Sequence, residues 1–199
     1  MGQIQPRDGK TFFILGSIGS MLMSIASIFM VIFGFYMVFF GSVPFMYILA
    51  IVSSIVFVVG VCFEGLGYYG FYRSYGAPMG IVGYIFSILI LIYLFICTIL
   101  PTVQPTVYGD YMWFYTYYTP AIIFYVGGLV LLGIMEIMFG MTLIFLRNET
   151  GMPELCLANG IILITAGSFI ASYYGSIIGF VLLFIGGVIN TVIFLRAKV

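Results

Sequence analysis

The sequence predicts an all-α membrane protein, a polytopic bundle of six transmembrane helices arranged as three helical hairpins. Of its 199 residues, 64% are hydrophobic and only 6% are charged, whereas a soluble domain carries about 25% charged residues. So few charges could not cover a water-soluble fold of this size. We therefore expect a single transmembrane domain over residues 1–199, with the lipid bilayer as its first partner.

Six apolar segments are each long enough to cross a hydrocarbon core of roughly 30 Å, some of them with tilt. All seven prolines lie outside these segments or in their first turn, which predicts uninterrupted helices. Thr119 and Pro120 are the predicted start of the fourth span, as an N-cap followed by a proline in the first turn. The predicted spans are residues 12–40, 45–72, 80–100, 120–146, 154–174 and 177–195.

The positive charges predict how the bundle is oriented. All six fall on the side that carries both chain ends: Arg7, Lys10, Arg73, Arg147, Arg196 and Lys198. Because lysine and arginine are enriched in cytoplasmic loops, we expect both termini in the cytoplasm and the protein in the cell membrane. On the opposite side, residues 101–118 are rich in tyrosine and are expected to lie along the outer membrane interface.

Two glutamates lie inside apolar spans. Glu136 belongs to the segment Leu131–Arg147, and Glu64 lies in a similar segment that ends at Arg73. At a rise of 1.5 Å per residue, Glu64 and Glu136 lie about 13 Å and 16 Å from the cytoplasmic ends of their helices. The two carboxyl groups are therefore expected at nearly the same depth.

Glycines flank each of these glutamates on its own helix face, at three or four residues' distance. Small residues along one stripe allow another helix to approach closely, so both carboxyl groups are expected to point into the bundle. The predicted helix-packing residues are Gly60, Gly67, Gly133 and Gly140.

A charged, isolated carboxylate at this depth would be costly. We therefore expect neutral carboxyl groups that are hydrogen-bonded across helices, or one proton shared between Glu64 and Glu136, with Asn190 as a third partner. Two interpretations stay open, a relay for protons or cations and a polar contact that fixes which helices meet. The tyrosines at the end of the second span, Tyr68, Tyr69, Tyr72 and Tyr75, are interpreted as interfacial anchors.

The composition disfavours other classes of function. The chain has no histidine, and its three cysteines lack the spacing of metal or haem sites, so we expect no cofactor and no metal. Intramembrane hydrolases of the serine-histidine, serine-lysine and paired-aspartate kinds each need residues that the predicted spans lack, and we expect no enzyme. A formal net charge of zero gives no indication of a nucleic-acid partner.

The run from Gly67 to Gly76, GYYGFYRSYG, is followed by a new apolar span from Ile81. This helix end and turn resembles that of uncharacterised six-helix membrane proteins common in archaea, a domain of unknown function. The resemblance implies the same six-helix membrane fold, and it brings no established activity with it.

Two functions follow as hypotheses. The first is a non-catalytic accessory or structural subunit of a larger integral membrane complex, because the chain lacks cofactor ligands but has small-residue stripes that could dock neighbouring subunits. The alternative is a small proton- or cation-coupled carrier or channel that uses the intramembrane glutamates. A hydrophilic cavity that reaches Glu64 or Glu136 would favour the carrier, and a tightly packed interior would count against it.

Overall fold

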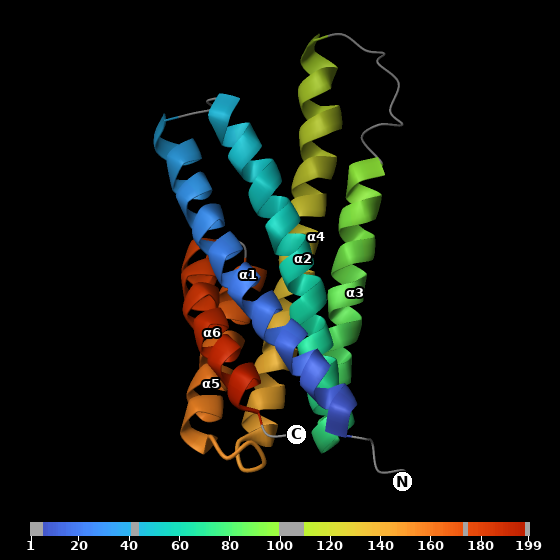
Figure 1. Ribbon diagram of the computed structural model, residues 1–199. Coiled ribbons are helices and arrows are strands. Elements are labelled where there is room, and N and C mark those ends of the chain that lie inside the picture. The colour runs from blue at the N-terminus through green and yellow to red at the C-terminus, as the bar shows by residue number, and fades with distance from the viewer. Residues whose placement is uncertain (1–5, 41–43, 100–109, 173–174, 198–199) are drawn as a thin grey trace.

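The computed structural model describes residues 6–40, 44–99, 110–172 and 175–197. These residues form six α-helices and no strand, which confirms the predicted all-helical class. All six are long and apolar enough to cross a membrane. The helices are α1 (Pro6–Phe40), α2 (Pro44–Tyr75), α3 (Pro78–Ile99), α4 (Asp110–Leu146), α5 (Pro153–Ala171) and α6 (Ser176–Arg196) (Figure 1).

The helix ends follow local chemistry at several points. Proline begins α1, α2, α3 and α5, where its missing N–H would have no partner in the helix and its fixed φ suits the first turn. Gly76 and Gly151, both at φ 71°, provide the left-handed residues in the turns after α2 and α4. The Gly76 N–H donates to the Tyr72 carbonyl at 2.9 Å and closes the end of α2.

The predicted start of the fourth helix is wrong, because α4 begins at Asp110 and includes Pro120. An internal proline removes one backbone hydrogen bond and crowds the carbonyl four residues earlier. Ending the helix there, however, would leave a whole turn of N–H and carbonyl groups to be satisfied in or near lipid. Residues 110–118 of the predicted outer connection belong to α4. The aromatic side chains of this connection lie outside the described part of the structure.

The six helices form a closed ring in which each packs against its neighbours in sequence and α6 packs against α1. Across the ring, α2 also touches α4, and α3 packs against both of them. The most buried span is that of α4, at 56%, whereas that of α3 is only 22% buried. The start of α1 and the end of α6 lie at the same end of the bundle, together with the turns after α2 and α4 (Figure 1).

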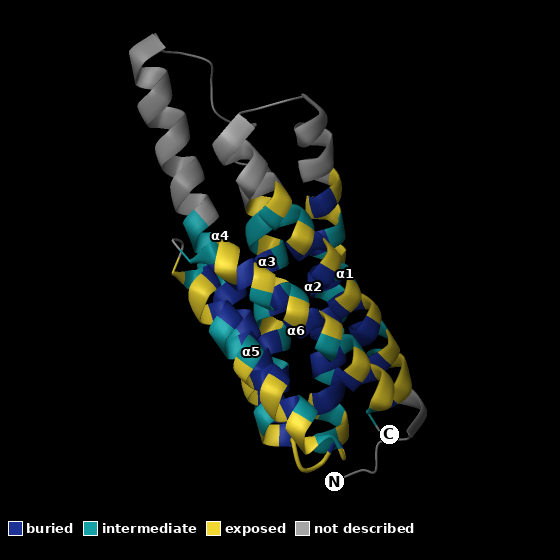
Figure 2. Ribbon diagram, turned by 90° about the vertical axis from the view of Figure 1, so that its left-hand side faces the viewer, coloured by how far each residue is buried: buried dark blue, intermediate teal, exposed yellow. Residues whose placement is uncertain are grey.

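Glycines bring neighbouring helices to backbone contact. A Cβ atom on Gly67 of α2 would lie 2.5 Å from the Cα of Gly16 on α1. On the other side of the ring, a Cβ on Gly133 of α4 would lie 2.5 Å from the carbonyl oxygen of Gly167 on α5. Since no side chain fits at such distances, these faces are buried, and the exposed residues lie on the outer faces (Figure 2).

Candidate functional site

Every helix contributes a buried polar side chain to the bundle interior. None of these side chains is more than 1% exposed. They are Ser20 from α1, Glu64 and Tyr68 from α2, Ser87 from α3, Glu136 from α4, Asn159 from α5 and Asn190 from α6.

Glu64 is held by donors from two other helices. The Ser20 hydroxyl donates to Glu64 Oε1 at 2.6 Å, and the Asn190 side-chain amide donates to the same oxygen at 2.8 Å. The close approach of α1 makes the first bond possible, because a Cβ on Gly19 would clash with the backbone nitrogen of Glu64. The second oxygen, Glu64 Oε2, is buried and has no partner among the described residues.

Asn190 joins three helices. Its Nδ2 also donates to the Tyr68 hydroxyl at 2.8 Å, and its Oδ1 accepts from the Tyr68 hydroxyl and from Asn159 Nδ2, both at 3.1 Å. Two consecutive glycines, Gly186 and Gly187, let α6 pack closely against both α5 and α1. A Cβ on Gly186 would crowd Leu163 of α5, and one on Gly187 would crowd Ser24 of α1. Asn190 lies one helical turn beyond these glycines and so reaches partners on both sides.

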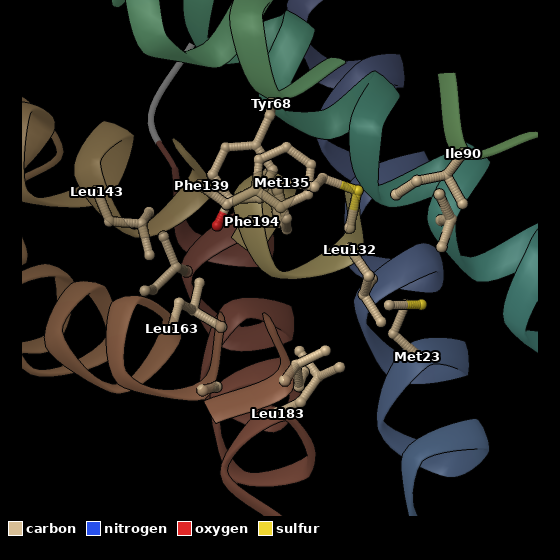
Figure 3. Close-up of a cluster of buried hydrophobic side chains, with 14 of the residues drawn as sticks. Met23, Tyr68, Ile90, Leu132, Met135, Phe139, Leu143, Leu163, Leu183 and Phe194 are labelled. Atoms are coloured by element: carbon tan, nitrogen blue, oxygen red, sulfur yellow. The ribbon is translucent and has the colours of Figure 1, made fainter. Parts of the chain in front are cut away.

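Glu136 has a different environment. It is fully buried, yet neither of its carboxyl oxygens has a hydrogen-bond partner among the described residues. Its position opposite Glu64 follows from the stacking of Tyr68 on Phe139, whose ring centroids are 3.7 Å apart with the planes 3° from parallel (Figure 3). Glu64 precedes Tyr68 by one turn and Glu136 precedes Phe139 by one turn on helices that run the same way. The two carboxyl groups are therefore at the same level in the bundle.

Four buried oxygens in this cluster lack a donor within the described structure. They are Glu64 Oε2, both carboxyl oxygens of Glu136 and Asn159 Oδ1. Three of the four belong to carboxyl groups, which can take up a proton and become donors themselves. An ionised carboxylate can also bind a cation. No group of three or more His, Cys, Asp or Glu side chains placed to hold a metal ion occurs in the described part of the chain.

The structure brings the predicted residues together unequally. Glu64 and Asn190 are directly hydrogen-bonded, whereas Glu136 makes no hydrogen bond to either of them. The interpretation of Tyr68 as an interfacial anchor is wrong, because it is fully buried and bonded to Asn190. Tyr68 follows Glu64 by four residues and so shares its helix face. This spacing was the feature of the sequence that could have indicated an inward-facing Tyr68. Asn159, which the sequence analysis missed, is the only amide side chain within the α5 span.

A pocket of about 470 Å³ opens at the end of the bundle that carries the first residue of α1 and the last of α6. It is lined by Lys10, Phe13, Ile14, Phe194, Leu195 and Ala197. None of the four unpaired oxygens lines it, so the polar cluster is closed off from this pocket in the present conformation.

Comparison with protein-family models, with curated proteins and with solved structures finds no match to this chain. The resemblance to archaeal six-helix membrane proteins stays a prediction.

Proposed function

We propose that the protein is a small proton- or cation-coupled carrier or channel that uses Glu64 and Glu136 as its intramembrane binding groups. The observation that supports this proposal is the group of four buried oxygens without a donor among the described residues, three of them on the two glutamates. Native structures contain few buried polar groups of this kind, and each one calls for an explanation.

The physical argument rests on the cost of leaving these oxygens unpaired. A buried acceptor without a donor costs about 1–3 kcal/mol, and more if it is charged. One proton bound at Glu136 removes a charge and converts an acceptor oxygen into a donor. A small cation between the carboxyl groups would satisfy several acceptors at once. A bound proton or cation would therefore stabilise the core, which supports the two glutamates as intramembrane binding groups.

The orientation that accompanies this function is also a proposal. We infer that the helices act as three hairpins in the cell membrane, with both chain ends in the cytoplasm. The inference rests on Lys10, Arg73, Arg147 and Arg196, which lie within about one turn of helix ends on one side of the bundle.

Proton flux tests the proposal. The purified protein is reconstituted into liposomes with a trapped pH-sensitive dye, and a potassium diffusion potential drives protons inward. Glu136→Gln is expected to slow the flux by roughly a hundredfold, since a relay group that cannot take a proton blocks transfer. Glu149→Gln is the matched control, because Glu149 is exposed in the turn after α4.

A carrier coupled to another solute would show no flux by itself, so a second measurement is included. A change of pH is expected to produce the infrared band of a protonated carboxyl group in the reconstituted protein. The band should be lost in Glu136→Gln and kept in Glu149→Gln. If Glu64→Gln and Glu136→Gln leave both the flux and the band unchanged, the proposal is wrong.

A second candidate is the non-catalytic accessory subunit of a larger membrane complex. The observation that favours it is the closed interior, since Glu64 and Glu136 are at most 1% exposed and the described pocket does not reach them. In that case the polar cluster serves to hold α1, α2, α5 and α6 in register. Native mass after solubilisation in mild detergent is the test, and a monomer or self-dimer without a partner would contradict it.

A further inference from the structure

Phe194 on α6 lies between the pocket and the polar cluster. It lines the pocket, and its side chain is only 1% exposed. On its inner side it meets Tyr68 edge-to-face, with ring centroids 5.3 Å apart, and stacks on Phe71 at 5.1 Å. Asn190, which bonds Glu64, precedes Phe194 by one turn on the same helix. The ring of Phe194 thus lies between the pocket and Tyr68, whose hydroxyl bonds Asn190.

The ring fills a space that other helices leave open for it. A Cβ on Gly16 of α1 would lie 3.0 Å from a ring carbon of Phe194, and a Cβ on Gly67 of α2 would lie 2.7 Å from another. At these two positions the neighbouring helices offer only backbone, whereas Phe13 of α1 and Tyr68 and Phe71 of α2 border the rest of the ring. Removing the ring leaves a gap bordered by two glycines, and no side chain at Gly16 or Gly67 exists to close it.

The pocket carries a positive charge at its mouth. Among the described residues that line the pocket, Lys10 is the only charged one, and it is exposed. A fixed positive charge at a mouth with apolar walls lowers the local concentration of inorganic cations. The same charge repels an excess proton, so the identity of the ion rests on Glu64 and Glu136 and not on the charge of the pocket.

We propose that the pocket between α1 and α6 is the entrance through which protons reach Glu64 and Glu136, and that Phe194 closes it. This inference rests on the proposed function for the identity of the ion. Displacement of the Phe194 ring admits water from the pocket to Asn190 and Ser20. Return of the ring separates the two compartments, and this prevents a continuous leak.

Thiol labelling tests the route without requiring transport. Ser20→Cys places a thiol beside Glu64, in a chain whose Cys62, Cys97 and Cys156 are replaced by alanine. A membrane-impermeant thiol reagent is added to the side with both chain ends. Phe194→Ala is expected to raise the labelling rate about tenfold, because the buried thiol becomes accessible without local opening.

Phe180→Ala is the matched control, since Phe180 is a buried phenylalanine of α6 that does not line the pocket. Phe194→Leu, which keeps more volume, should fold if Phe194→Ala does not and should raise labelling to a smaller extent. The inference is overturned if neither Phe194 variant exceeds Phe180→Ala, or if labelling rises equally with reagent on the opposite side.

The two proposals can fail separately. Faster labelling in Phe194→Ala without any proton flux or protonated-carboxyl band would support the pocket as an entrance. It would contradict the proposal that protons are the ion that enters. Proton flux that depends on Glu136, with unchanged labelling in both Phe194 variants, would support the carrier and overturn the entrance.

Discussion

Glu64 on α2 and Glu136 on α4 have the same local sequence pattern but different surroundings. Each lies in an apolar span between glycines that press against a neighbouring helix. Glu64 accepts two hydrogen bonds on one oxygen, from Ser20 and Asn190. Glu136 accepts none from the described residues. One glutamate is thus anchored in the fold, and the other is available to a proton or cation.

The difference comes from the neighbouring helix, which is α1 for Glu64 and α5 for Glu136. On α1, the stripe that faces α2 carries Ser20 one turn after Gly16, and its hydroxyl reaches across to Glu64. On α5, the stretch between Gly160 and Gly167 carries a single hydroxyl, that of Thr165. Thr165 donates to the carbonyl of Ile161 on its own helix, at 2.8 Å. A motif on one helix therefore acquires its role from the side chains opposite.

The strongest test of this comparison replaces each glutamate by methionine, which has similar length and no charge. Glu64→Met leaves the Ser20 hydroxyl without its acceptor and is expected to lower the free energy of unfolding by about 2 kcal/mol. Glu136→Met removes an unpaired carboxyl group and is expected to raise it by about 1 kcal/mol. Denaturant titration in mixed micelles, followed by circular dichroism, measures both.

Opposite signs for the two methionine variants are the decisive feature. A loss of stability in Glu136→Met as large as that in Glu64→Met would mean that Glu136 has structural partners of its own. The difference between the two carboxyl groups would then disappear.

A loss similar to that of Glu64→Met, without an opposite change elsewhere, is expected from the glycine contact that presses α4 against α5. Gly133→Ala places a Cβ 2.5 Å from the Gly167 carbonyl oxygen, so the helices must separate, at a cost of about 2 kcal/mol. Gly128→Ala on the same helix meets nothing closer than 3.4 Å and gains helix propensity, so it should be neutral or slightly stabilising. Thermal unfolding in detergent compares the two, and equal losses would show that the contact is not tight.

The smallest expected effect isolates the Ser20 hydroxyl. Ser20→Ala removes the bond to Glu64 and should lower the free energy of unfolding by about 1 kcal/mol. Ser27→Ala removes a hydroxyl that is equally buried but donates to Met23 of its own helix, and it should have little effect. The same denaturant titration measures both variants. If Ser27→Ala costs as much as Ser20→Ala, the interhelical bond is not what anchors Glu64.

Much of the site could be predicted from spacing along single helices. Matched depth and flanking glycines predicted inward-facing positions for Glu64 and Glu136, and both are buried. The four-residue spacing from Glu64 placed Tyr68 on the same helix face, but it was outweighed by the usual interfacial position of tyrosines near a helix end. Its burial depends on Phe139, which comes from a helix more than sixty residues away. The start of α4 was missed because proline usually marks the first turn, whereas here the helix continues through Pro120.

The sequence by itself determined that the chain forms apolar helices and where most of them begin, because composition, proline and glycine act locally. It also determined which glutamates lie inside apolar spans. Only the tertiary structure decided that α2 meets the serines of α1 while α4 meets an apolar face of α5. Hydrogen bonds between helices depend on which helix faces meet. The sequence of one face does not specify its partner, because the same face could pack against several other helices. The distinction between an anchored Glu64 and an unpaired Glu136 exists only once the ring of helices has closed.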